Sequence, residues 1–432
     1  MSTEIINAGP LPLRGEITPP GDKSITHRSL MLGAIAEGVT SVKGFLRSDD
    51  TASTAEAMRA MGAQIESSSD NLKITGRGLR GLKEPESVID AGNSGTTARL
   101  LTGLLCAQSF STELTGDKYL RERPMKRVVE PLRLMGAEIT GNEDGNKLPL
   151  VISGRKLRPV SYEMPVASAQ VKSAILLAGL YAEGRTEVIE KNPTRDHTER
   201  MLSYMGVQIE RNGSSISVNP PEKLSASGIT VPADISSAAF FIVAALINRG
   251  SEVLIKNVGL NPLRTGVIDI LREMGGNIEA LNLRELNGEP VSDLAVKSSD
   301  LHGVSISSDI IPKAIDELPV LAVAACFAEG ETIISDASEL RVKETDRIKA
   351  ITSELRKLGA SVEEFEDGMK ITGTGYLKGA VCSSWGDHRI AMSVAVAGTC
   401  ALGDTEIEDA ASVSISYPGF FGTLKTLRNR AK

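Results

Sequence analysis

Basic side chains gather at one helix start near the N-terminus, in the segment PGDKSITHR. Lys23, Ser24 and Arg28 occur together there. If the helix begins near Ser24, Arg28 lies one turn along, and the free N–H groups of the first turn add positive partial charge. This combination suits a phosphate or carboxylate ligand. An ordinary capped helix with exposed basic side chains has the same local pattern, so this segment alone leaves both interpretations open.

Two later segments place small and polar residues at other helix starts. GNSGTTAR, which contains Gly95, would let the backbone approach a ligand closely. ASAQVKS offers the neutral side chains of Ser168 and Gln170. A tight turn explains the first segment equally well, and simple helix capping explains the second.

Further charged residues stand near the starts of other helices. Arg123 in RERPMKR and Arg195 in TRDHTER each precede or open a helix. In LRVKETDRIK, we expect Lys343, Glu344 and Arg347 to share one helical neighbourhood. A solvated, salt-bridged helix face is the usual meaning of such a run.

Asp316 and Arg389 complete the set of candidate residues. Asp316 opens a helix that then becomes wholly apolar, so its carboxylate could be a cap, and Arg389 could be paired with a neighbouring aspartate. We expect His27 and His388 to support neighbouring arginines, and His197 to be a polar residue at a helix start.

The elements that must position these residues recur along the chain. A polar loop opens an Ala- and Leu-rich helix six times, with starts at Ser24, Ser94, Ser168, Ser236, Glu317 and His388. A second, amphipathic helix ends in a glycine that is expected to be a left-handed C-cap, at Gly62, Gly136, Gly206, Gly275 and Gly359. The opening stretch INAGPLPLRGEI resembles a third recurring segment, a strand, and would complete the sixth unit.

Two similar junctions divide the chain. ITPPGDKS covers 17–24 and ITVPADIS covers 229–236, and each has proline just before a helix start. The sequence therefore predicts two lobes of three units each, one over 22–232 and the other over 1–21 plus 233–432. If the six unit ends face one cleft, all the candidate residues meet there.

Composition restricts the class of protein. The 432 residues are 41% hydrophobic and 24% charged, and the net charge is −7, which argues against a nucleic-acid or acidic-membrane surface. The four cysteines form no CxxC pair, so neither a disulfide framework nor a metal site is suggested. We find no signal peptide and no apolar stretch that could cross a bilayer, so we expect a cytoplasmic protein. The GxGxxG match at Gly76, Gly78 and Gly81 precedes no helical segment, so it is read as a repeat turn and not as a dinucleotide site.

Taken together, these motifs resemble the family of bacterial 5-enolpyruvylshikimate-3-phosphate synthases, the 3-phosphoshikimate 1-carboxyvinyltransferases. PGDKSITHR, GNSGTTAR, RERPMKR, ASAQVKS, TRDHTER, IDELP, LRVKETDR and GDHRIAM stand in the family's order and spacing, essentially end to end. The resemblance implies an α/β protein with a two-lobed inverse α/β barrel fold, six repeats, helices inside and sheets outside. It implies a monomer without metal or organic cofactor, whose lobes close when shikimate-3-phosphate binds.

The implied reaction transfers the enolpyruvyl group of phosphoenolpyruvate to the 5-hydroxyl of shikimate-3-phosphate and releases phosphate, one step before chorismate on the route to aromatic amino acids. By resemblance, the phosphoenolpyruvate-binding residues are Lys23, Gly95, Arg123, Gln170, Arg347 and Arg389. The residues implied to bind shikimate-3-phosphate are Lys23, Ser24, Arg28, Ser168, Gln170, Arg195, Asp316 and Lys343. We expect Asp316 to be the base, and Glu344 and Lys23 to transfer protons at the enolpyruvyl carbons.

The sequence departs from the family pattern at three positions. Ala169 stands where many relatives have serine, which predicts the loss of one hydrogen bond to phosphate, and Glu339 stands where some have asparagine. Ala411 replaces a lysine found in some relatives, which predicts the loss of its contact with phosphoenolpyruvate. Gly95 is retained, which predicts inhibition by glyphosate. One rival is the sister enolpyruvyl transferase acting on UDP-N-acetylglucosamine, but its reactive loop cysteine has no counterpart in GDKYLRERP, and Cys106 falls in an apolar helix. A second rival is a noncatalytic anion-binding repeat protein, which would not need Asp316 or Glu344.

Overall fold

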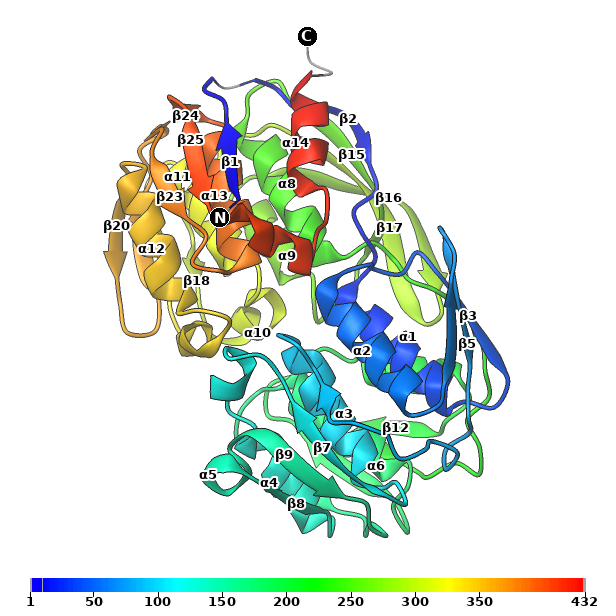
Figure 1. The fold of residues 1–432 in the computed structure, drawn as a ribbon. Helices are drawn as coiled ribbons and strands as arrows, with labels where there is room; N and C mark the ends of the chain where they lie inside the picture. Colours follow the sequence, from blue (N-terminus) through cyan, green and yellow to red (C-terminus); the bar gives the residue numbers. More distant parts are fainter. Residues whose placement is uncertain (1, 10, 430–432) are drawn as a thin grey trace. The chain divides into compact units, whose positions relative to one another are not determined.

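The computed structural model describes residues 2–9 and 11–429, and the chain forms two compact units (Figure 1). Unit 1 consists of Met1–Pro20, Pro232–Arg284 and Pro290–Lys432. Unit 2 consists of Gly21–Val231 and the short segment Glu285–Glu289. From the sequence, 285–289 were expected to belong with the rest of 233–432. These residues group with unit 2 because Gly288 and Glu289 contact the helix that begins at His197.

Unit 2 contains three four-stranded sheets and three pairs of helices. Its sheets are β14 (Gly228–Thr230), β3 (Val39–Lys43), β5 (Asn71–Thr75) and β4 (Gln64–Ser67); β6 (Ile89–Asp90), β7 (Ser111–Thr115), β9 (Lys147–Ser153) and β8 (Glu138–Gly141); and β10 (Ser161–Glu163), β11 (Thr186–Ile189), β13 (Ser215–Val218) and β12 (Ile209–Asn212). Its paired helices are α1 (Lys23–Ile35) and α2 (Asp49–Ala60), α3 (Gly95–Leu105) and α4 (Lys126–Leu134), and α6 (Ala169–Gly179) and α7 (His197–Tyr204).

Unit 1 has a similar make-up. Its sheets are β16 (Asn277–Leu286), β17 (Glu289–Lys297), β15 (Glu252–Gly259) and β2 (Arg14–Ile17); β18 (Ser305–Ile306), β19 (Glu331–Ile334), β21 (Met369–Thr372) and β20 (Ser361–Glu364); β1 (Thr3–Ile6), β25 (Thr405–Glu408) and β23 (Val381–Ser383); and the short pair β22 (Leu377–Lys378) and β24 (Ala401–Leu402). Its main helices are α8 (Ile235–Ile247), α9 (Gly266–Glu273), α11 (Leu318–Cys326), α12 (Arg347–Lys357), α13 (His388–Gly398) and α14 (Phe420–Asn429).

One order of strand pairing recurs in these sheets. In the first sheet of unit 2, β14 and β3 are parallel, whereas β3–β5 and β5–β4 are antiparallel. The other two sheets of unit 2 and the β18–β19–β21–β20 sheet of unit 1 follow the same order. The N-terminal stretch is split: β1 joins β25, and β2 joins β15. Residue 10 of that stretch lies outside the described residues.

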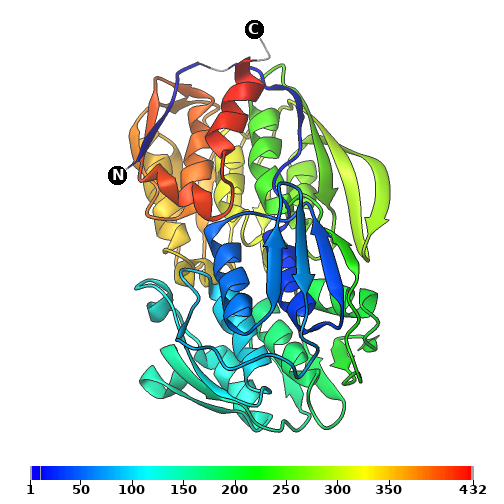
Figure 2. The same ribbon diagram turned by 45° about the vertical axis from the view of Figure 1, so that its right-hand side comes forward.

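Six helices, three in each unit, lie in the cores because they are rich in small apolar side chains. Helices α1, α3, α6, α8, α11 and α13 begin within one residue of the starts expected from the sequence, and nearly all their residues are buried. In unit 1, α8, α11 and α13 contact one another (Figure 1). In unit 2, α1 and α2 pack on one side of the sheet that contains β3 and β5 (Figures 1 and 2, blue).

Glycine ends the second helices, as expected. Gly62, Gly136, Gly206, Gly275 and Gly359 have φ values of 92°, 95°, 88°, 93° and 84°, in the left-handed region that favours glycine. The GxGxxG segment follows β5 and leads into turn and loop residues, so the expected repeat turn is confirmed. Within 2–9 and 11–429, no helix is both long and apolar enough to cross a membrane.

Candidate functional site

The start of α1 is a capped helix end that carries two of the expected site residues. The side chain of Asp22 accepts a hydrogen bond from the Ile25 N–H, which fixes the first turn. Lys23 Nζ lies 3.0 Å from Asp50 Oδ2 at the start of α2, and both side chains are partly exposed. Lys23 and Ser24 are therefore half-buried residues at a helix N-terminus, where an anion is favoured.

Arg28 lies one turn further along and is almost fully buried. Its Nε donates to Thr198 Oγ1 at 2.7 Å, its Nη2 to Ser173 Oγ at 2.8 Å, and its Nη1 to the Ser24 carbonyl at 2.9 Å. Burial lowers the pKa of Arg28 to about 10, and the positive charge of Arg195 acts in the same direction against several carboxylates. Arg28 and Arg195 therefore act on each other as like charges at the starts of α1 and α7, where an anion would stabilise both.

A second group of residues surrounds Gly95, the first residue of α3. A Cβ atom on Gly95 would lie 3.0 Å from Arg99 Nη1 and 3.4 Å from Arg123 Nη1. Arg99 Nη1 donates to Gln170 Oε1 at 2.7 Å, and Arg123 Nη2 donates to Asn93 Oδ1 at 2.6 Å. Gly95 thus leaves space beside two guanidinium groups. We define the cationic cluster of unit 2 as Lys23, Arg28, Arg99, Arg123 and Arg195.

Helix α6 contributes both expected and unexpected side chains. Ser168 is its N-cap, and its hydroxyl accepts from the Val171 N–H at 3.4 Å, so the capping interpretation holds. Gln170 Nε2 donates to Thr96 Oγ1 at 3.1 Å. Lys172, which the sequence analysis did not single out, is fully buried and lies 3.1 Å from Glu190 and 2.7 Å from Glu199. Its alternation with apolar neighbours in the helix was the only signal that could have pointed to it.

Unit 1 holds a different arrangement, centred on Arg347 at the start of α12. Its buried guanidinium lies 2.8 Å from Asp387, 2.6 Å from Glu344 and 3.2 Å from Asp316. Burial acts to lower the pKa of Arg347, but these three carboxylates together raise it well above its ordinary value. We define the carboxylate cluster of unit 1 as Asp316, Glu344 and Asp387 around Arg347.

The Asp316 carboxylate lies close to three basic side chains of this unit, those of Arg347, Lys343 and Arg389. Asp316 lies in the turn between α10 (Ile311–Ala314) and α11. Lys343 Nζ is 3.8 Å from Asp316 Oδ1, and Arg389 Nη2 is 3.9 Å from Asp316 Oδ2. Arg389 Nη1 also donates to the Asp316 carbonyl at 2.9 Å. The Asp316 carboxylate is therefore engaged by side chains and does not serve as a simple cap.

Two expectations about local structure were wrong. Lys343 and Glu344 lie in the loop before α12, not on its face, because Asp346 caps that helix through the Lys349 N–H at 3.0 Å. The loop nevertheless brings Glu344 to Arg347. His27 does not support an arginine through a hydrogen bond: its Nδ1 is 2.7 Å from Thr54 Oγ1, and its Nε2 has no partner among the described residues.

Each unit thus assembles its own part of the expected site. Unit 2 has Lys23, Ser24, Arg28, Gly95, Arg123, Ser168, Gln170 and Arg195. Unit 1 has Asp316, Lys343, Glu344, Arg347 and Arg389. Across the part of the chain that the structure describes, no three His, Cys, Asp or Glu side chains are placed to hold a metal ion.

Comparison with known proteins decides the family. The sequence model of EPSP synthase, described as 3-phosphoshikimate 1-carboxyvinyltransferase, matches residues 8–424. The chain belongs to the EPSP synthase family. A 3-phosphoshikimate 1-carboxyvinyltransferase of Geobacter sulfurreducens is 57% identical over 412 residues, which cover 95% of this chain and 96% of that protein. One from Geotalea uraniireducens is 57% identical over 413 residues, covering 96% of each.

Solved structures agree with this assignment. An EPSP synthase from Acinetobacter baumannii has a TM-score of 0.89 and 46% identity, and the match covers 99% of this chain and 98% of that one. As a member of the EPSP synthase family, the protein is a transferase with a mixed α/β fold.

The cysteines of this protein are not placed for nucleophilic chemistry. Cys106, Cys326, Cys382 and Cys400 are all buried, and burial raises the pKa of each thiol to about 12. A thiol with so high a pKa is not a nucleophile at neutral pH. The loop before α4, residues 116–124, contains no cysteine.

Proposed function

We propose that the cationic cluster of unit 2 binds the anionic groups of phosphoenolpyruvate and shikimate-3-phosphate, and that the carboxylate cluster of unit 1 transfers protons between them. In the EPSP synthase family reaction, the enolpyruvyl group of phosphoenolpyruvate passes to the 5-hydroxyl of shikimate-3-phosphate and phosphate leaves. This protein catalyses that step of the shikimate pathway.

Charge carries the binding proposal. Each substrate has a phosphate and a carboxylate, so bringing the two together costs Coulomb energy that fixed cations must offset. The electrostatic action of Arg195 on Arg28, and the approach of Arg99 and Arg123 to Gly95, support two anion subsites. In unit 2, we assign shikimate-3-phosphate to Arg28 and Arg195 with Ser24 and Ser168, and phosphoenolpyruvate to Gly95 and Arg123. Lys23 and Gln170 are assigned to both substrates.

Unit 1 contributes the remaining contacts in this proposal. Lys343 and Asp316 would bind shikimate-3-phosphate, and Arg347 and Arg389 would bind phosphoenolpyruvate. Arg347 donates a hydrogen bond to the Asp316 carboxylate and Arg389 donates one to the Asp316 backbone carbonyl, which together support a fixed position for this residue. A fixed carboxylate reduces the cost of orienting the reacting groups.

The chemistry needs a base and an acid. Asp316 is the proposed base that accepts the proton of the attacking 5-hydroxyl, and Glu344, with Lys23, is the proposed acid for the methylene carbon. The O–C bond forms at C2 of the enolpyruvyl group as its methylene gains a proton. The tetrahedral adduct then loses a methyl proton and phosphate, which restores the double bond.

The finer architecture belongs to the same proposal. We propose that each unit is an inverse α/β barrel of three repeats, with helices inside and sheets outside. The nearly complete burial of α1, α3 and α6, beside strands that alternate between exposed and buried residues, supports it. We further propose a cytoplasmic monomer whose units close on shikimate-3-phosphate. An unchanged X-ray scattering profile at saturating shikimate-3-phosphate would contradict closure.

A phosphate-release assay tests the acceptor. With phosphoenolpyruvate present, we expect shikimate-3-phosphate to support turnover and UDP-N-acetylglucosamine to give none, because the chain belongs to the EPSP synthase family. The reverse preference would contradict the proposal. Glyphosate should inhibit turnover, since Gly95 leaves space beside Arg99 and Arg123. Normal turnover at high glyphosate would contradict that part.

A further inference from the structure

Strands β16 and β17 form a hairpin whose tip, Glu285–Glu289, belongs to unit 2, although the rest of the hairpin belongs to unit 1. The two central residues of its turn, Asn287 and Gly288, have φ values of 50° and 81°. Two left-handed residues in succession make a tight hairpin turn, and Asn-Gly is the dipeptide that favours it. The turn is therefore a tight two-residue turn at the end of the hairpin.

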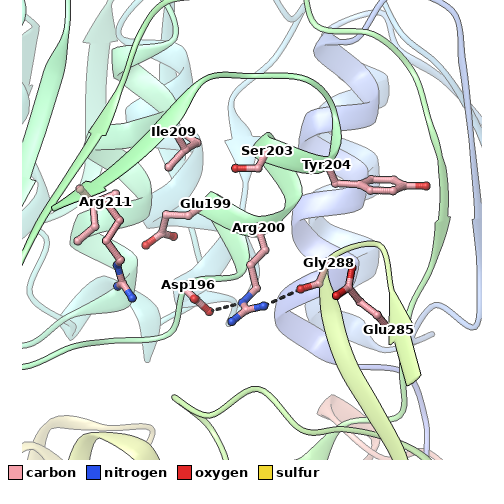
Figure 3. A pocket seen from close by; sticks show the side chains of 10 residues that line it. Asp196, Glu199, Arg200, Ser203, Tyr204, Ile209, Arg211, Glu285 and Gly288 are labelled. Carbon is pink, nitrogen blue, oxygen red and sulfur yellow. Dashed lines mark hydrogen bonds and ion pairs between the residues drawn. The ribbon is translucent and has the colours of Figure 1, made fainter. Parts of the chain in front are cut away.

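The tip contacts the first turn of α7 at two points. Arg200 Nη1 donates to the Gly288 carbonyl at 2.6 Å, while Arg200 Nε donates to Asp196 Oδ1 at 2.9 Å (Figure 3). Glu289 Oε1 lies 2.7 Å from His197 Nδ1, and both side chains are buried, with 4% and 3% of their surface exposed. Two interactions therefore join the tip to the start of α7. One is the buried Glu289–His197 pair, and the other is Arg200, whose guanidinium binds both Gly288 and the N-cap residue Asp196.

Asn287 secures the tip itself. Its Nδ2 donates to the Thr230 carbonyl at 2.7 Å, and its Oδ1 accepts from the Thr230 N–H at 3.3 Å. Thr230 belongs to β14, a strand of unit 2. The tip is therefore tied to the sheet of the unit as well as to the helix.

The start of α7 is next to Arg195 and contacts Arg28, two of the groups proposed to bind shikimate-3-phosphate. Arg195 stands two residues before His197, and Thr198 directly follows His197. Thr198 Oγ1 accepts from Arg28 Nε at 2.7 Å and lies 2.8 Å from Ser173 Oγ. The negative charge of Glu289 also acts on Arg28, in the direction that favours its charged form. A shift of the α7 start would therefore move Arg195 and the partner of Arg28 together.

We infer that the hairpin tip is a positioning element for acceptor binding, in which Glu289 acts through His197, and Gly288 through Arg200, to hold Arg195 and Thr198 where shikimate-3-phosphate needs them. The inference rests on the proposed assignment of Arg195 and Arg28 to that substrate. Glu289 itself touches no substrate in this account, so it is a positioning residue and not a catalytic one.

Calorimetric binding of shikimate-3-phosphate and steady-state kinetics of Glu289→Ala and Glu289→Gln test the inference. We expect Glu289→Ala to raise the Kd and KM for shikimate-3-phosphate roughly ten- to a hundredfold, because a small displacement of a binding group has effects of this size. The KM for phosphoenolpyruvate should change far less. Glu289→Gln retains a hydrogen-bond acceptor for His197 and should recover part of the loss. Glu285→Ala, an exposed residue of the same tip, is the matched control and should bind like the original protein.

Arg195→Ala separates the two levels of the proposal. If Arg195→Ala weakens shikimate-3-phosphate binding while both Glu289 variants bind within twofold of the original protein, the positioning role is wrong. If Arg195→Ala also binds normally, the proposed substrate assignment itself fails. If Glu289→Gln raises the KM for shikimate-3-phosphate and the KM for phosphoenolpyruvate equally, the Glu289–His197 pair is a general structural contact, and the inference is overturned. Should Glu289→Ala not fold, Glu289→Gln and His197→Gln carry the same comparison.

Discussion

Arg28 and Arg347 are both buried arginines at helix starts, yet their surroundings are opposite. Arg28 donates to two hydroxyls and a carbonyl, and burial lowers its pKa to about 10. Arg347 has three carboxylates within 3.2 Å, which outweigh burial and raise its pKa. Unit 2 thus keeps a cation that an added anion would stabilise, whereas unit 1 neutralises its cation with acids.

This difference separates binding from proton transfer. Hydroxyl and carbonyl partners orient a guanidinium without cancelling its charge, so the charge remains for a phosphate or carboxylate ligand. A carboxylate held by an arginine keeps a fixed position, which a general base needs. We therefore expect variants of the cationic cluster of unit 2 to act mainly on substrate affinity, and variants of the proposed proton-transfer carboxylates of unit 1, Asp316 and Glu344, mainly on turnover.

The largest effect is expected at Asp316. Asp316→Asn keeps the shape of the side chain but removes the proposed base, so kcat should fall by about 10²- to 10⁴-fold in a phosphate-release assay. Asp300→Asn, an exposed aspartate of the same unit, is the control. Full activity of Asp316→Asn would assign the base elsewhere and would favour a noncatalytic role for this residue.

The two arginines should differ in their effect on stability. Arg347→Met leaves three acidic groups without their shared partner and should lower the free energy of unfolding by about 3–5 kcal/mol. Arg28→Met leaves hydroxyls and a carbonyl, so about 1–3 kcal/mol is expected. Urea unfolding of both variants measures the difference, and equal losses would remove the contrast between the two sites.

A methyl group at Gly95 should act on one substrate only. Its Cβ would lie 3.0 Å from Arg99 Nη1 and 3.4 Å from Arg123 Nη1, so Gly95→Ala must displace the guanidinium groups by a few tenths of an ångström. We expect the KM for phosphoenolpyruvate to rise roughly tenfold and glyphosate inhibition to weaken. Gly228→Ala, where a Cβ would meet nothing within 4 Å, is the control. An unchanged KM would place phosphoenolpyruvate elsewhere.

The smallest effect concerns pH. Burial, followed by the charges of Lys23 and Arg28, holds the pKa of His27 well below its ordinary value of 6.5, against the opposite effect of Asp22. The unfolded chain therefore takes up this proton first, so the stability that neutral His27 contributes is complete above pH 6.5 and is lost as the pH falls toward the folded pKa. His27→Gln should flatten the acid side of the stability curve, by at most ~1.4 kcal/mol per pH unit. The free energy of unfolding of both proteins is measured in urea between pH 5 and pH 7. The same change of that free energy with pH in the original protein and in His27→Gln would contradict this prediction.

The helix starts and their glycine caps could be predicted from the sequence because both depend on local patterns. The first turn of α1 and the left-handed Gly62 are examples. Arg99 was missed because only the close approach of α3 and α6 gives it a partner in Gln170. Glu289 was missed for a similar reason, since a hairpin remote in sequence supplies the contact to His197. The loop position of Glu344 depends on the cap at Asp346, which competes with helix extension.

Calorimetric titration of shikimate-3-phosphate into the original protein, Arg28→Met and Asp316→Asn tests the division between the two units most directly. The account predicts that Arg28→Met loses at least tenfold in affinity, because a buried cation that faces the anion is gone. It predicts that Asp316→Asn, which keeps a hydrogen-bonding side chain, binds within a few-fold of the original protein. Tight binding by Arg28→Met, together with weak binding by Asp316→Asn, would contradict it.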